Sequence, residues 1–144
     1  MAAESSRVEL RLSNDPLLLG AVAGAVEHFA QRAGLDTAGQ TDLIAAAEEA
    51  CRDTFKLLPG NAAMLGVIVQ DFPDRVEITI EHQGEALPTA GLDTFALLGA
   101  EGAAPGELTG LALLARVDRV QYQTEGGTSR MTLIKYVHRS PAKP

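Results

Sequence analysis

The chain has 144 residues, enough for about one domain, and 46% of them are hydrophobic, which excludes a disordered chain. Aromatic residues make up only 4%, so the predicted core is aliphatic, and the single cysteine, Cys51, excludes an internal disulfide. The longest apolar run, residues 17–26, is too short for a bilayer span, which needs about 20 residues. No secretory signal pattern precedes it. We therefore expect a cytoplasmic protein without a membrane partner, with one domain over residues 1–144, its core over 7–138 and a polar tail over 139–144.

The formal net charge is −7 and is unevenly distributed along the chain. Residues 1–110 carry 6 basic against 17 acidic side chains, whereas residues 111–144 carry 6 against 2. An acidic body repels phosphates, so the composition predicts no nucleic-acid partner. The same charge suits a basic protein partner or serves solubility alone, and both interpretations stay open.

The first half of the chain predicts one strand and two helices. Residues 7–13 alternate polar and apolar side chains, which is typical of a half-buried strand. Asn14-Asp15-Pro16 then opens a helix over 16–33, and Thr37 is the expected N-cap, with Gln40 as capping-box partner, of a second helix that ends near residue 58. The buried stripes expected for the two helices are Leu18, Val22, Val26 and Phe29, and Leu43, Ile44, Ala47, Ala50, Cys51, Thr54 and Phe55.

The second half predicts four strands around a long connection. The elements are strands over 64–71 and 76–82, a Gly-, Ala- and Pro-rich segment over 83–109 with a short helical turn at 94–99, a helix over 111–117, and strands over 120–124 and 128–137. Glu-Gly-Gly between the last two strands is a hairpin signal. The helices are not interleaved as crossovers, so we expect an α+β fold: a two-layer sandwich of a mixed, mostly antiparallel sheet with helices on one face.

Three stretches resemble the bacterial anti-sigma-factor serine kinases, members of a superfamily that includes gyrase, heat-shock chaperones and sensor histidine kinases. They are Ala46-Ala-Glu-Glu-Ala-Cys-Arg-Asp53 in the second helix, Ile78-Thr-Ile-Glu-His-Gln-Gly84, and Gly110-Leu-Ala-Leu-Leu-Ala-Arg-Val-Asp-Arg-Val120 with the hairpin that follows it. The resemblance spans most of the chain and implies the histidine-kinase-like ATPase fold.

For catalysis, the resemblance implies a role for two carboxylates of the second helix. Glu49 stands at the position of the catalytic glutamate, and Asp53 replaces the asparagine that holds magnesium. A spacing of four residues puts both carboxylates on one helical face, and a carboxylate oxygen remains a ligand that Mg²⁺ accepts. The alternative is a solvated acidic face beside Arg52 and Lys56.

For nucleotide binding, the resemblance implies His82, Gly84, Gly106 and Gly110 as the cofactor-binding residues. His82 replaces the aspartate that binds adenine, while Gly84 is kept. The alternative for His82 is a histidine at a strand end, half in solvent. Gly110 is also kept for the phosphates, but Leu108 stands where the family has its other glycine, and Gly106 serves only if the loop is re-registered.

These replacements predict a regulatory protein that acts by binding a protein, with its site for ATP and Mg weakened or lost. The implied partner is a sigma factor or an antagonist protein of a partner-switching system. The alternative is an active ATP-dependent serine kinase that phosphorylates the antagonist. We also expect a homodimer, because Leu17 and Leu19 lie outside the predicted buried stripe and the family pairs through this region. The two leucines otherwise close the core at the start of the helix.

Overall fold

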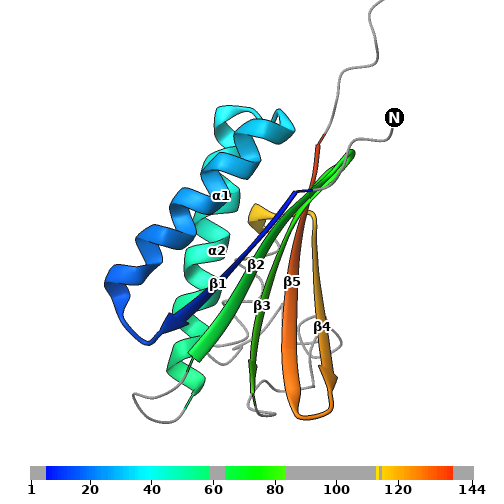
Figure 1. Ribbon diagram of the computed structural model, residues 1–144. Helices are drawn as coiled ribbons and strands as arrows, with labels where there is room; N and C mark the ends of the chain where they lie inside the picture. The colour runs from blue at the N-terminus through cyan, green and yellow to red at the C-terminus, as the bar shows by residue number, and fades with distance from the viewer. Residues whose placement is uncertain (1–5, 59–63, 84–112, 114, 138–144) are drawn as a thin grey trace, which may run out of the picture.

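Figure 1 shows the computed structural model of the chain, in which residues 6–58, 64–83, 113 and 115–137 are described. The elements are β1 (Arg7–Ser13), the 3₁₀ helix η1 (Pro16–Leu18), α1 (Leu19–Ala33), α2 (Thr37–Leu57), β2 (Met64–Phe72), β3 (Arg75–Gln83), β4 (Arg119–Glu125) and β5 (Thr128–Tyr136). Each predicted strand lies within two residues of an observed one. The long segment over 84–109 and its turn at 94–99 lie outside the described residues. In the helix predicted over 111–117, the described Leu113, Ala115 and Arg116 are helical.

The five strands form one sheet in the order β1-β2-β3-β5-β4. Every described pair of neighbouring strands is antiparallel, so the sheet is antiparallel throughout rather than mixed. Helices α1 and α2 pack side by side on one face of this sheet (Figure 1). The predicted α+β two-layer sandwich is confirmed.

The core lies between the helices and the sheet and is aliphatic, as the composition predicts. Every second residue of β2 and β3 is buried, as the alternation in their sequences requires. The largest fully buried side chains are Leu43, Leu65, Ile78, Ile80, Leu113, Leu133, Val22, Val26, Val67, Val69, Val76 and Thr54. Cys51 is also buried, and burial raises the pKa of its thiol to about 12, so this thiol is not a nucleophile at neutral pH.

Two local expectations at the helix starts are wrong. The N-cap of α2 is Asp36 rather than Thr37: the Asp36 carboxylate accepts a hydrogen bond of 2.7 Å from the Gly39 backbone N–H, and the Gln40 side chain donates to the Leu35 carbonyl. At α1, Leu17 is exposed as expected, but Leu19 is buried at 7% exposure. Leu19 lies three residues before Val22 and so shares the core face of α1.

The opposite face of the sheet carries mostly polar side chains, and none of the described helices covers it (Figure 1). We call it the open face. It comprises Arg7, Glu9 and Arg11 of β1, Gly66, Ile68 and Gln70 of β2, Glu77, Thr79 and Glu81 of β3, Arg119, Gln121 and Gln123 of β4, and Arg130, Thr132 and Ile134 of β5. Its side chains line up across the strands, as the 3.2 Å contact between the Thr79 and Thr132 hydroxyls shows.

Candidate functional site

The two carboxylates predicted to act together on α2 are each paired with a different cation. Nε of Arg116 lies 3.6 Å from Oε2 of Glu49, and its Nη1 lies 3.6 Å from Oδ1 of Asp42, two turns earlier on α2. Asp53 instead lies 3.5 Å from the ammonium of Lys56. Arg116 thus ties the chain segment before β4 to the acidic face of α2.

The Glu49 carboxylate is the less satisfied of the two. About one third of its side chain is exposed, yet its Oε2 is buried and accepts no hydrogen bond from the described residues. The Arg116 guanidinium, at 3.6 Å, lies beyond hydrogen-bond distance of this oxygen. No group of three or more His, Cys, Asp or Glu side chains within the described residues is arranged to hold a metal ion. The roles of Glu49 as catalytic base and of Asp53 as metal ligand therefore stay predictions.

His82 is buried on the core side of β3, with 3% of its surface exposed, so the interpretation as a half-solvated residue at a strand end is wrong. Nδ1 lies 2.9 Å from the Gln83 carbonyl oxygen. A carbonyl oxygen only accepts, so Nδ1 is the donor of this hydrogen bond. Nε2 is buried without a hydrogen-bond partner in the described part of the chain. Gly84, Gly106, Leu108 and Gly110, the other positions implicated in nucleotide binding, lie outside the described residues.

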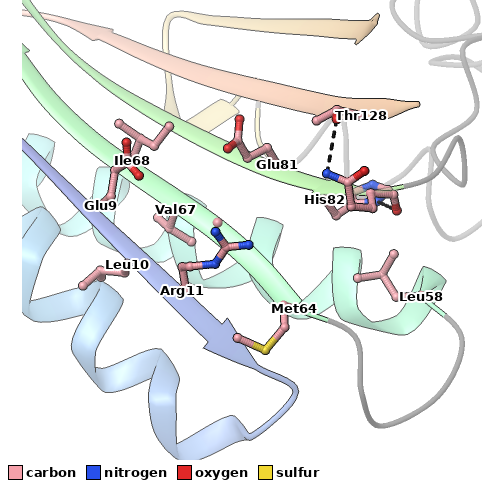
Figure 2. Close-up of a pocket in the computed structure, with 12 residues that line it drawn as sticks. Glu9, Leu10, Arg11, Leu58, Met64, Val67, Ile68, Glu81, His82 and Thr128 are labelled. Carbon is pink, nitrogen blue, oxygen red and sulfur yellow. Dashed lines mark hydrogen bonds between the residues drawn. The ribbon is translucent and has the colours of Figure 1, made fainter. Parts of the chain in front are cut away.

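A depression of about 510 Å³ lies at the β1–β2–β3 part of the sheet (Figure 2). It is lined by Glu9, Leu10, Arg11, Leu58, Met64, Gly66, Val67, Ile68, Glu81, His82, Gln83 and Thr128. Five of them belong to the open face: Glu9, Arg11, Gly66, Ile68 and Glu81. Figure 2 shows the Arg11 guanidinium reaching from β1 across β2. We call this depression the Gly66 pocket.

Most of the charge around the Gly66 pocket is already neutralised by ion pairs. Glu9 is paired with Arg7, and Oε2 of Glu81 accepts a hydrogen bond of 2.8 Å from Nε of Arg130. Arg11 has no ion-pair partner among the described residues. The pocket was not predicted from the sequence. The available signal was the glycine within an alternating strand, since such a glycine often marks a close approach of a ligand or another backbone.

No family model matches the sequence, and no curated protein matches it either. Among solved structures, the fold is similar to a chain in the crystal structure of the SiaB–SiaC complex from Pseudomonas aeruginosa, with a TM-score of 0.58. The two sequences are 15% identical, and the match covers 90% of this chain and 89% of that chain. At this identity the similarity shows a common fold.

These comparisons overturn the assignment to the anti-sigma-factor serine kinases, which is wrong. The chain matches no model of that family, and the similarity found is to a chain of the SiaB–SiaC complex. None of the described helices is long and apolar enough to cross a membrane.

We expect Mg-ATP to bind this chain with a dissociation constant weaker than ~1 mM, equivalent to less than ~4 kcal/mol of affinity. His82 is buried against the backbone of its own strand, and Asp53 is paired with Lys56, so neither side chain is free to bind a nucleotide or its metal without rearrangement. Isothermal titration calorimetry with Mg-ATP measures this affinity. A micromolar dissociation constant contradicts the prediction.

Proposed function

We propose that the chain is a regulatory protein that acts by binding a protein partner within a partner-switching system. The observation that carries this proposal is the open face, a broad sheet surface without a described helix over it. Ile68, near its centre, is only half-buried, and ion pairs neutralise most of the charges around it. A surface with an apolar centre and satisfied charges is suited to desolvation by a protein.

Two further observations support a protein partner. The similar solved chain comes from a complex between two proteins, as its name states. The net charge of −7 favours encounter with a basic surface. Within this proposal, the partner classes to test first are a sigma factor and an antagonist protein.

Site-specific photo-cross-linking in the source cells tests the proposal. A benzophenone amino acid at Gln121, which is exposed on the open face, should give a discrete adduct with another protein. The same probe at Thr41, which is exposed on α2, is the matched control and should give none. Ile68→Arg should remove the Gln121 adduct, because a charge in the interface centre is costly to desolvate.

An adduct of equal yield from both positions, or a Gln121 adduct that survives Ile68→Arg, contradicts the proposal. Circular dichroism on purified Ile68→Arg separates loss of binding from loss of fold. Failure to form any adduct at Gln121 likewise counts against binding through this face.

We also propose a homodimer that pairs through α1. Leu17, in η1 just before α1, is 86% exposed, and the residues that follow it at helical spacing on α1 are exposed and mostly small: Gly20, Ala21, Gly24, His28 and Gln31. A Cβ atom built on Gly20 or Gly24 has no neighbouring atom within 4 Å, so packing within the monomer does not require glycine at either position. The solvent-facing side of a surface helix usually carries charged residues. A solvent-facing side made of small and uncharged residues instead favours burial against another chain.

Sedimentation equilibrium at micromolar concentration should therefore give the mass of a dimer, and Leu17→Glu should give that of a monomer. The control is Thr41→Glu, which adds the same charge at an exposed site on α2 and should leave the dimer intact. A monomeric wild-type chain rules out this pairing.

A further inference from the structure

The floor of the Gly66 pocket is formed by a glycine. Gly66 pairs with Arg11 of β1 on one side and with Glu81 of β3 on the other. A Cβ built on Gly66 comes within 3.2 Å of Cγ of Glu81, so a side chain at this position requires Glu81 to shift by a few tenths of an ångström and takes up space in the pocket. The glycine thus leaves bare backbone between two charged side chains, which is an arrangement that lets another molecule approach closely.

Among the Glu and Arg side chains that line the pocket, Arg11 is the one without an ion-pair partner in the described part of the chain. Across the strands, Gly66 is followed by Glu81 of β3 and then by Arg130 of β5. The ion pair between Glu81 and Arg130 neutralises these two side chains. Glu9 is neutralised by Arg7 in the same way. This leaves the guanidinium of Arg11, whose planar set of donors matches the oxygens of a carboxylate, sulfonate or phosphate.

The sides of the pocket supply apolar contact. Met64 is 44% exposed, an unusual exposure for a large apolar side chain in this protein, and Ile68 lies on the same face two pairs along β2. Methionine adapts its shape to what it contacts. The volume of about 510 Å³ lies within the range of pockets that hold small organic molecules, roughly 300–1,000 Å³.

We infer that the Gly66 pocket binds a small organic anion, with its acidic group on Arg11 and its apolar body against Gly66, Met64 and Ile68. This function goes beyond the proposed protein binding, and it stands or falls separately from it. Binding of the anion requires the guanidinium of Arg11, the absence of a side chain at Gly66, and the apolar side chains of Met64 and Ile68. A single substitution removes the guanidinium, and another fills the space at Gly66.

The probe for the test is 8-anilinonaphthalene-1-sulfonate, an aromatic body with one sulfonate, and its neutral counterpart is N-phenyl-1-naphthylamine. Fluorescence titration should show saturable binding of the sulfonate to the folded protein. Arg11→Gln should weaken this binding about tenfold or more, because it removes hydrogen bonds to a charged group, and should leave the neutral dye unaffected. Gly66→Val should abolish binding of both dyes.

The matched control is Arg119→Gln, which removes an arginine from the same face but at the β4 edge, outside the pocket. It should leave the sulfonate affinity unchanged at about 0.15 M salt, where charge effects fade within ~8 Å. Equal weakening by Arg11→Gln and Arg119→Gln overturns the inference, as does absence of saturable binding.

Backbone amide shifts locate the dye independently of any variant. On addition of the sulfonate, the largest ¹⁵N–¹H changes should fall on Arg11, Gly66 and Ile68. Changes centred on the helices instead place the dye elsewhere and overturn the inference, even if Gly66→Val proves too unstable to titrate.

Discussion

Leu133→Ala should lower the free energy of unfolding by about 2–5 kcal/mol, the range for removing a fully buried leucine side chain. Leu133 has no exposed surface and lies on β5, where it pairs with Ile78 of β3 and Val120 of β4. Because β5 has neighbours on both sides and the core in front, the cavity has little room to collapse. Urea denaturation monitored by circular dichroism measures the loss.

The control for Leu133→Ala is the neighbouring residue on the same strand. Thr132 points to the open face, where its hydroxyl lies 3.2 Å from that of Thr79. Thr132→Ala removes this one contact and should cost no more than about 1 kcal/mol. Equal losses for the two variants contradict the register and the assignment of faces.

Replacing both Gly126 and Gly127 by valine should lower the free energy of unfolding by about 2–4 kcal/mol. These glycines form the turn between β4 and β5, with φ of 59° and 80°. Two consecutive residues with positive φ form the tight turn whose twist matches the paired strands, and β-branched residues are strained there. Thermal or urea unfolding of the double variant measures the cost.

One single variant controls for the turn. Gly126→Asn should be nearly neutral, because asparagine tolerates this backbone conformation. A neutral double valine variant contradicts the backbone assignment at this turn.

Local patterns in the sequence predict most of the fold. The alternation over residues 7–13 and the hairpin glycines depend only on residues close in the chain, and both match the structure. The errors at the helix starts are also local. Asp36 and Thr37 are both good N-caps, so the choice between them depends on where the chain turns toward α2.

The site depends on contacts that the sequence does not show. The pairing of Arg116 with Glu49 joins residues far apart in the chain. Likewise, only the strand register places Arg11, Gly66 and Glu81 in one row. His82 continues the alternation of the buried residues Ile78 and Ile80, so its side chain faces the core.

The strand order has a consequence for how far the length of this protein can vary. The two hairpins, β2–β3 and β4–β5, each close locally, and they meet in the β3–β5 pair, where Gln83 faces Thr128. The connection between the hairpins leaves the sheet at the end of β3 and enters it again at β4, on the other side of β5. Because the entropy of closing such a connection grows only logarithmically, doubling its length costs about 0.6 kcal/mol. Insertions there are thus expected to be tolerated far better than a single residue added within β3 or β5, which shifts every following side chain to the opposite face.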